Sequence, residues 1–310
     1  MWRLAGDENS DGTEGLTMNF AKLPPGRKFV VIHEDDVGMS HGANAAFAEL
    51  SAIGNCSSGS VMPPCPWFAE AIEMAKRDDK LDLGVHLTLT SEKKPYRWRP
   101  LTAPPRSAGL TDAMGYFWPD VPSARKADPK VVESELRAQV EMTLATGIDV
   151  THIDAHMGTA LCPEFVDIYL SLGVDYKLPI LLVKDYNTFN PRSYSGPMTN
   201  DRYNAALAKA KAKGFPVFDL VQETLWDRRT DCETAYRAMF RSLPEGLTFL
   251  SLHFNAPGDF EAVEPEKAYI RSDEFALFQR NRIREWISDN ALEIVGMREL
   301  RDDLRSRWSS

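Results

Sequence analysis

Short apolar segments recur along the chain, and the intervals between them leave room for helices. Each segment is rich in Val, Ile, Leu or Phe, a composition that favours buried β-strands. The predicted strands cover residues 28–35, 58–63, 82–89, 149–155, 178–183, 216–221, 248–254 and 291–296. Strands that alternate with helices predict a parallel sheet covered by those helices.

The segments between the strands carry helical signals. Over residues 129–146, Asp128 can cap the first turn, Pro129 suits the first helical position, and Gly147 ends the helix. The apolar stripe of this helix consists of Val132, Leu136, Val140 and Leu144. A helix with a broad apolar face is predicted over residues 272–288, and further helices over residues 41–53, 66–77, 163–172, 200–213 and 231–242.

Eight predicted strands favour a closed or nearly closed barrel. We therefore expect an α/β protein with a single (β/α) barrel-like domain, related to the TIM barrel, whose active site lies at the C-termini of the strands. An open doubly wound sheet is the alternative, although the chain has no GxGxxG or P-loop sequence for nucleotide binding. The domain is predicted over residues 28–310, after a flexible N-terminal extension of residues 1–27 that is poor in apolar periodicity.

Composition and charge narrow the possible partners. The chain has 310 residues, of which 43% are hydrophobic, and a net charge of -9. This charge argues against a nucleic-acid or anionic-membrane partner, because phosphate binding needs a basic face. No apolar stretch approaches the roughly 20 residues that span a bilayer, and the first residues lack a signal-like apolar region, so we expect a cytoplasmic protein. The four cysteines show no CxxC pairing and are interpreted as reduced thiols.

Two long segments interrupt the alternation, at residues 91–127 and 184–199. Loops of this length are often lids or binding loops. Their aromatic residues can stack on sugar rings, or they can seal the loops onto the body of the protein, and the second interpretation is the simpler one for any single aromatic. Exposed aromatic loops are also compatible with a homodimer.

Acidic and imidazole side chains occur where several predicted strands end. Asp35 and Asp36 follow a fully apolar run, and the other polar ends are His86, Asp154 with His156, and His253. Two adjacent buried carboxylates are unfavourable unless a cation or proton compensates them. Parallel strands deliver these groups to one rim, so the pattern predicts a divalent-metal site beside a free carboxylate, as in metal-assisted hydrolysis. The rival interpretations are a helix N-cap for the acidic pair and a hydrogen-bonded core role for each histidine.

Three motifs closely resemble those of the YdjC-like carbohydrate deacetylase family, which includes the chitooligosaccharide deacetylases. They lie at residues 35–38, 84–90 and 151–156, and the similarity extends to Asn44, to residues 61–68 and to the C-terminal strands and helices. The resemblance covers residues 28–302 and implies a barrel-like deacetylase with an Asp-His-His metal site.

The resemblance also assigns residue roles by motif. It implies that Asp36, His86 and His156 bind one divalent metal ion, zinc or magnesium first, with manganese, nickel and cobalt also admissible. Asp35 would be the general base, and His253 matches the late family histidine that acts as general acid. His152 and Asp154 would flank the last ligand and orient an imidazole, and His152 can also exchange roles with His156.

The chain departs from the family pattern around these residues. The family usually reads Asn-Ala-Asp-Asp-Phe-Gly, whereas His33, Glu34 and Val37 surround the acidic pair here. Met157, Gly158 and Ala160 follow His156, and the proline after His253 comes only at Pro257. These changes leave every predicted ligand in place and affect the surroundings of the site and the shape of its pocket. His33 can be a core residue or can line the pocket.

The function expected from the residues and the resemblance is metal-dependent hydrolysis of an N-acetyl group on a carbohydrate or sugar-like amine. Acetate and a free amine would be the products, so the enzyme would act on a C–N bond other than a peptide bond. The alternatives are a metal-dependent hydrolase of another amide or ester, or a carbohydrate- or metabolite-binding protein on the same fold that has lost catalysis.

Overall fold

The computed structural model describes residues 18–186 and 200–309. Its centre is a parallel sheet with the strand order β4-β3-β2-β1-β6-β5, in which β7 pairs with β1 beside β2. The strands are β1 (Lys28–Val37), β2 (Ser58–Val61), β3 (Leu83–Leu87), β4 (Ile153–Ala155), β5 (Leu220–Glu223), β6 (Gly246–Leu252) and β7 (Leu292–Ile294). The parallel order is the one expected for strands joined through helices.

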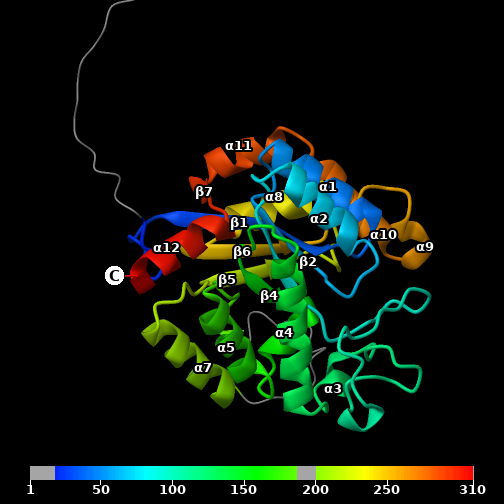
Figure 1. The fold of residues 1–310 in the computed structure, drawn as a ribbon. Helices are drawn as coiled ribbons and strands as arrows, with labels where there is room; N and C mark the ends of the chain where they lie inside the picture. Colours follow the sequence, from blue (N-terminus) through cyan, green and yellow to red (C-terminus); the bar gives the residue numbers. More distant parts are fainter. Residues whose placement is uncertain (1–17, 187–199, 310) are drawn as a thin grey trace, which may run out of the picture.

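Helices cover the sheet on two sides, as Figure 1 shows. Those above it in that view are α1 (His41–Ala52), α2 (Phe68–Arg77), α8 (Cys232–Ser242), α9 (Phe260–Val263), α10 (Ala268–Phe278) and α11 (Arg282–Asp289). Those below it are α3 (Val121–Ala124), α4 (Pro129–Ala145), α5 (Val166–Tyr176) and α7 (Asp201–Ala212). Short 3₁₀ helices occupy Arg106–Ala108 and His156–Leu161. The predicted α/β barrel-like fold is confirmed.

The strand predicted over residues 178–183 is wrong, because the segment forms isolated bridges and no regular strand. Its bridges nevertheless explain how the sheet curls. The segment makes two isolated bridges, Ile153↔Ile180 on the β4 side and Val183↔Phe218 on the β5 side. It changes partner within a few residues, so neither side extends into a strand. The two bridges nevertheless connect the edge strands β4 and β5, and the sheet takes the curvature of a barrel.

The helix predicted over residues 272–288 is also wrong, because it is two helices. α10 ends at Phe278 and α11 begins at Arg282, with a turn in which the Arg280 N–H donates to the Leu277 carbonyl at 3.1 Å. Across the turn, both apolar faces pack against aromatic residues of α8. Phe278 packs against Tyr236 of α8, and Trp286 packs against Phe240.

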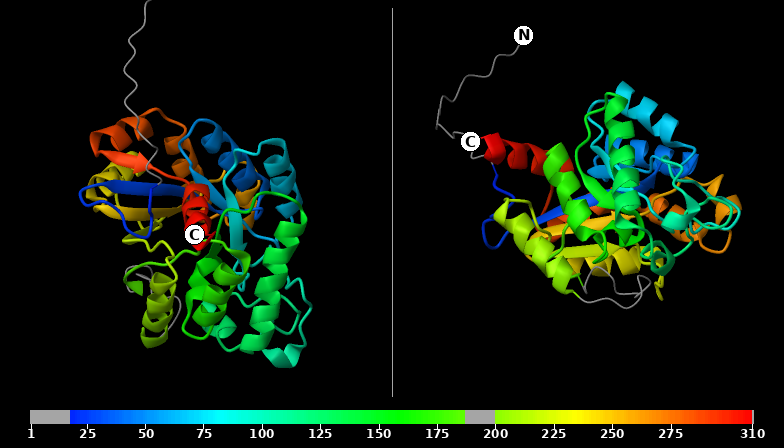
Figure 2. Two further views of the ribbon diagram at one scale, coloured as in Figure 1. Left: turned by 60° about the vertical axis from the view of Figure 1, so that its left-hand side comes forward. Right: turned by 60° about the horizontal axis from the view of Figure 1, so that its bottom comes forward.

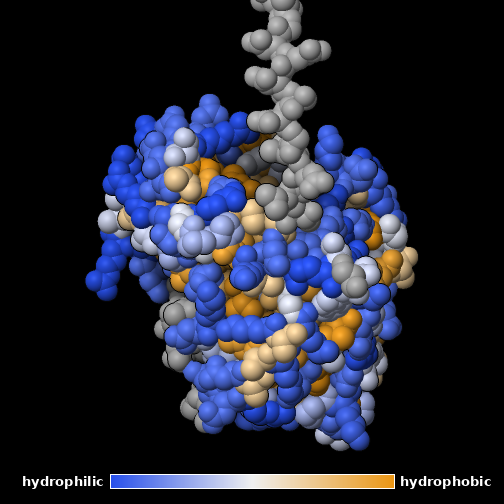
Figure 3. Space-filling view, turned by 90° about the vertical axis from the view of Figure 1, so that its left-hand side faces the viewer, coloured by the Kyte–Doolittle hydropathy of each residue, from blue (hydrophilic) through white to orange (hydrophobic). Residues whose placement is uncertain are grey.

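The last helix, α12 (Met297–Ser309), closes the end of the barrel where the strands begin (Figure 2). Its Arg298 N–H donates to Asp82 at 2.7 Å, and Arg301 donates to the Val150 carbonyl at 3.0 Å. Phe20 is buried at the same end. Hydrophobic patches break the largely hydrophilic surface there (Figure 3). Helix α12 and Phe20 therefore cover the end of the barrel where the strands begin, and the polar strand ends lie on the opposite side.

The aromatic residues of segment 91–127 mainly seal it onto the body. Trp98 and Phe117 are buried, and the Trp98 indole donates to the Thr90 carbonyl at 2.8 Å. The Tyr96 hydroxyl donates to the Met39 carbonyl at 2.6 Å. The loop 184–199 lies largely outside the described residues, so its predicted role stays an expectation.

We expect Gly84→Ala to destabilise the protein by about 1–3 kcal/mol, since an added methyl group would overpack the barrel interior. A Cβ on Gly84 in β3 would lie 2.4 Å from the His152 ring. Urea denaturation measures the change. In a His152→Ala background the same substitution should cost much less, and an equal cost in both backgrounds would contradict this explanation.

Candidate active site

The ends of four strands place the predicted site residues around one pocket. Asp35 and Asp36 belong to the end of β1, His86 to β3, His156 follows β4, and His253 follows β6. The pocket has a volume of about 220 Å³. Its walls include Asp35, Asp36, Glu92, Asp154, His156, Trp226, Ser251, His253 and Arg271.

Both acids of the pair reach this pocket because the backbone at Asp36 is left-handed, with φ 63°. Consecutive side chains of an extended strand point to opposite faces, so a regular strand would turn one carboxylate away. The conformation is uncommon outside glycine, and the following turn holds it. Gly38 N–H donates to the Asn44 side-chain oxygen at 2.7 Å, and Met39 N–H to the Asp36 carbonyl at 2.9 Å.

Asp36, His86 and His156 form a group that can hold a metal ion. Asp36 Oδ1 lies 3.0 Å from His156 Nδ1 and 3.5 Å from His86 Nε2. This oxygen is buried and has no hydrogen bond of acceptable geometry among the described residues. A buried carboxylate oxygen without a well-directed hydrogen bond is costly, and a cation bound by these three groups would remove the cost. Two imidazoles and one carboxylate also match the donor set of a catalytic zinc site with an open position.

Each of the three residues is held from behind. His86 Nδ1 lies 2.9 Å from Asp154 Oδ1, and His156 Nε2 lies 3.0 Å from Glu92 Oε2. Arg271 donates to Asp36 Oδ2 at 2.9 Å. Hydrogen bonds of this kind fix ring orientation and tautomer at metal sites.

The same contacts shift the pKa values of these groups. Burial opposes the charged form of His156, but Glu92 and Asp36 outweigh it and raise the pKa to about 9. Burial likewise opposes ionisation of Asp36, but Arg271 and His156 hold its pKa well below the usual range. The site thus favours an ionised Asp36 beside positively charged partners. A bound divalent cation would supply the positive charge that a protonated His156 supplies in its absence.

Asp35 is held separately from the three residues above. Ser251 Oγ donates to its Oδ2 at 2.6 Å, and His33 Nδ1 lies 2.7 Å from its Oδ1. Burial alone would raise the pKa of Asp35, but His86, with His33, outweighs burial and holds the pKa below its usual range. An ionised, oriented carboxylate therefore lies beside the candidate metal site.

His253 faces both acids from β6. Its Nε2 lies 3.9 Å from Asp35 Oδ2 and 3.9 Å from Asp36 Oδ2. Trp226 packs against its ring, with the centroids 4.9 Å apart. Burial lowers the pKa of His253 to about 4. The ring is therefore mainly neutral at physiological pH.

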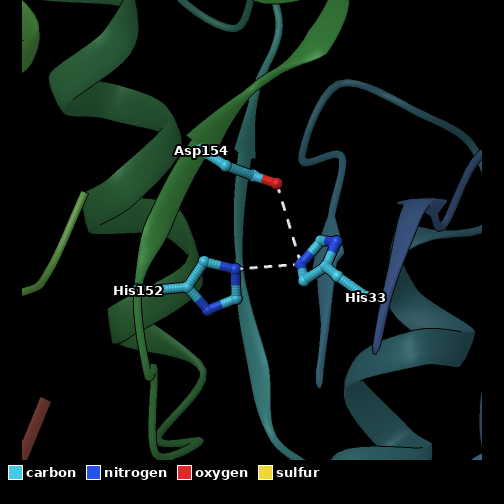
Figure 4. A group of neighbouring side chains, drawn as sticks. All are labelled: His33, His152 and Asp154. Atoms are coloured by element: carbon cyan, nitrogen blue, oxygen red, sulfur yellow. Dashed lines mark hydrogen bonds and ion pairs between the residues drawn. The ribbon is translucent and has the colours of Figure 1, made fainter. Parts of the chain in front are cut away.

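A second histidine pair lies deeper in the barrel (Figure 4). His33 Nε2 and His152 Nε2 are 3.0 Å apart, and Asp154 Oδ2 lies 3.7 Å from His33 Nε2. The His33 and His152 rings are hydrogen-bonded to each other, whereas Asp36 Oδ1 has no hydrogen bond of acceptable geometry among the described residues. This pair is best explained as a hydrogen-bonded support of Asp35. His152 therefore lies away from Asp36, where the structure places His156.

Several residues around the pocket have no sequence pattern that would predict them as part of the site. Glu92 lies in the long segment that follows β3, while Arg271 and Glu274 come from α10, far along the chain. Ser60 and Ser251 are ordinary strand residues whose hydroxyls contact Asp154 and Asp35. His33 is resolved as a buried partner of Asp35.

We expect Glu92→Gln to weaken metal binding by about 10- to 100-fold, because Glu92 orients the His156 ring from the side opposite Asp36. Titration of the metal-free protein with zinc, followed calorimetrically, measures the change. Glu73→Gln on exposed α2 is the matched control and should bind as the wild type does. Equal affinities in all three proteins would contradict the role of Glu92.

Comparison with known proteins identifies related sequences. A family profile described as YdjC-like protein matches residues 29–289. A carbohydrate deacetylase of Thermus thermophilus is 39% identical over 154 residues, 49% of this chain and 53% of that protein. One from Brevibacillus brevis is 29% identical over 175 residues, 56% of this chain and 67% of that protein. The chain thus spans about half the length of the Thermus relative.

A solved structure shows the same fold. A proposed cellobiose-phosphate cleavage protein of Enterococcus faecalis V583 superposes with a TM-score of 0.70 at 21% identity, over 88% of this chain and 99% of that one. Within residues 18–186 and 200–309, we find no helix with the length and apolarity needed to cross a membrane.

Proposed function

Since the chain belongs to the YdjC-like family, we propose that it is a metal-dependent hydrolase that removes N-acetyl groups from a carbohydrate or sugar-like amine. One observation carries the proposal. Asp36 Oδ1 is buried without a hydrogen bond of acceptable geometry and faces two imidazoles, while a second carboxylate, Asp35, lies in the same pocket. Carbohydrate deacetylases among the relatives support the choice of reaction.

In this proposal Asp36, His86 and His156 hold one divalent ion, zinc or magnesium. When bound, such an ion polarises the acetyl carbonyl and lowers the pKa of a water molecule. Arg271 neutralises part of the Asp36 charge and fixes its second oxygen. Glu92 and Asp154 keep the two rings in place, so the ligands need no rearrangement to bind.

Asp35 acts as the general base. Its carboxylate is ionised, and the Ser251 hydroxyl and His33 ring hold it at a fixed orientation. It accepts a proton from the attacking water, a task for which a positioned carboxylate is suited. Because Asp35 and Asp36 are adjacent, this proton acceptor stays next to the group that would bind the ion.

His253 protonates the departing amine through Nε2. An amide nitrogen is a very poor leaving group without a proton. Nε2 lies 3.9 Å from both acids, so the acid and the base approach the same reacting centre from different strands. Trp226 holds the plane of the imidazole.

The pocket restricts the size of the group that enters it. Its volume of about 220 Å³ is below the roughly 300–1,000 Å³ of pockets for drug-sized ligands. We therefore expect the acetamido group and one sugar ring to enter, with further rings of an oligosaccharide outside. We assign the catalytic domain to residues 28–310, with residues 18–27 packed at its far end through Phe20.

Acetate release from N-acetylated mono- and oligosaccharides by the metal-reconstituted protein tests the proposal. We expect release that disappears when a chelator removes the metal and returns when the metal is restored. Absence of release across the panel, with metal shown to be bound, would contradict the deacetylase assignment.

A further inference from the structure

A chain of hydrogen bonds leads from His253 into the wall of the barrel. His253 Nδ1 lies 2.9 Å from Thr224 Oγ1. Thr224 Oγ1 lies 3.0 Å from each carboxylate oxygen of Glu274 on α10. Thr224 and Glu274 are 2% and 0% exposed, so bulk water does not compete for these bonds. The ring nitrogen on the pocket side, Nε2, is the other end of the chain.

A proton can move along this chain toward His253 when the Glu274 carboxyl is protonated. Its Oε2 accepts the backbone N–H of His253 at 2.8 Å, and its Oε1 accepts the Tyr236 hydroxyl. A protonated Glu274 carboxyl can donate to Thr224 Oγ1, whose own proton is then directed at His253 Nδ1. A neutral imidazole that accepts at Nδ1 carries its proton at Nε2, on the pocket side.

We propose that Glu274 and Thr224 form a proton relay that resupplies His253 as it protonates the leaving amine. The proposal rests on the role given to His253 in the proposed function. His253 Nε2–H is transferred to the amine nitrogen, the Thr224 hydroxyl proton moves to His253 Nδ1, and the Glu274 proton moves to Thr224 Oγ1. No electrons are exchanged, and the proton is regained from solvent after the products leave.

The relay explains why these buried groups lie behind the histidine. A neutral imidazole that lost its Nε2 proton without gaining one at Nδ1 would become a high-energy anion. Transfer through Thr224 leaves the ring neutral throughout and moves the negative charge to Glu274. That charge is stabilised by the His253 backbone N–H and by the Tyr236 and Thr224 hydroxyls. Glu274 and Thr224 act through His253 and are positioning residues.

The buried surroundings of Glu274 favour a carboxyl that holds its proton. Burial raises the pKa of Glu274 to about 8, against the bonds from His253 and Thr224 and the charge of Arg228. Asp35 acts in the same direction as burial. The remaining titratable groups that face Glu274 are Glu34 on β1 and Cys232 and Tyr236 on α8.

Two substrates distinguish a relay from a purely structural role. An N-acetylated sugar needs a protonated leaving group, whereas an aryl acetate leaves as a phenolate without one. We expect Thr224→Val and Glu274→Gln to lower kcat on the sugar by about 10²- to 10⁴-fold and to affect the aryl acetate far less. Thr224→Ser, which keeps the hydroxyl, should restore most of the loss.

Thr143→Val is the matched control, because Thr143 is an equally buried threonine on α4 whose hydroxyl bonds to the Gln139 carbonyl at 2.9 Å. It should leave the ratio of the two rates unchanged. Equal losses on both substrates in Thr224→Val, or full activity on the sugar, would overturn the relay. Lack of acetate release by the wild type would instead contradict the proposed function.

The tautomer of His253 provides a readout that needs no substrate. Nitrogen-15 NMR of the metal-loaded protein, with His253 assigned by its loss in His253→Gln, distinguishes Nδ1–H from Nε2–H. The relay requires Nε2–H below the pKa of Glu274, and this tautomer should be retained in Glu274→Gln. An Nδ1–H tautomer in the wild type at neutral pH would overturn the relay, and this result does not depend on the choice of substrate.

Discussion

Asp35→Asn is expected to lower kcat by about 10²- to 10⁴-fold while metal affinity stays close to that of the wild type. The amide has nearly the same shape and can still accept the Ser251 hydroxyl, which lies 2.6 Å away, but it cannot take a proton from water. Asp35 lies outside the group Asp36, His86 and His156, although it forms a second group with His86 and Asp154 that could hold an ion; unchanged affinity in Asp35→Asn would favour the first group. Single-turnover acetate release, together with metal content after dialysis, measures both quantities.

Two variants sharpen this test. Asp79→Asn on the exposed surface changes the same functional group away from the pocket and should be fully active. Ser251→Ala removes only the hydrogen bond that orients Asp35 and should cause a smaller loss than Asp35→Asn. If Asp35→Asn turned over substrate at the wild-type rate, another residue would have to be the base.

His86→Ala is expected to lose both metal binding and turnover. Removal of a direct ligand should lower metal affinity by more than the roughly 10- to 100-fold caused by loss of an outer partner. It also leaves Asp154 Oδ1 without the ring that lies 2.9 Å away, which should reduce the free energy of unfolding by about 1–3 kcal/mol. Metal analysis after dialysis and thermal unfolding with and without added zinc measure the two effects.

The change in unfolding temperature on adding zinc compares metal binding by the wild type and by His86→Ala most directly. A ligand that binds only the folded state raises the unfolding temperature, and the stabilisation grows with the logarithm of the ratio of ligand concentration to Kd. Added zinc should therefore shift the wild type and leave His86→Ala unchanged. His41→Ala, at an exposed histidine paired with Glu70, is the control and should respond as the wild type does. An unchanged zinc response in His86→Ala would exclude His86 as a ligand.

The parts of the site that sequence predicts are those fixed by local pattern. Asp35, His86 and His156 each end or follow an apolar run, and parallel strands necessarily bring such ends to one rim. The strand boundaries of β1 and β3 and the cap of α4 follow from the same short-range rules. These features depend on neighbouring residues in the chain, so a single sequence contains the necessary information.

The parts that sequence did not predict depend on distant contacts. Arg271 and Glu274 lie on a helix whose apolar pattern ran on without a break, although the chain divides into α10 and α11. Their polar side chains lie buried against Asp36 and Thr224, contacts that the local sequence pattern does not specify. Segment 178–183 has the composition of a strand, but its two bridges lie on different neighbours.

The left-handed backbone at Asp36 has a consequence for how the site tolerates change. The Cα atoms of Asp35 and Asp36 are joined by one trans peptide unit and so lie about 3.8 Å apart, whatever the rest of the barrel does. Loops can lengthen, helices can shift and the pocket walls can diverge without altering this Cα separation, whereas the left-handed turn at Asp36 decides whether both carboxylates face the pocket. The walls of the pocket can therefore change while Asp35 and Asp36 stay together in it, provided that the turn at Asp36 is kept.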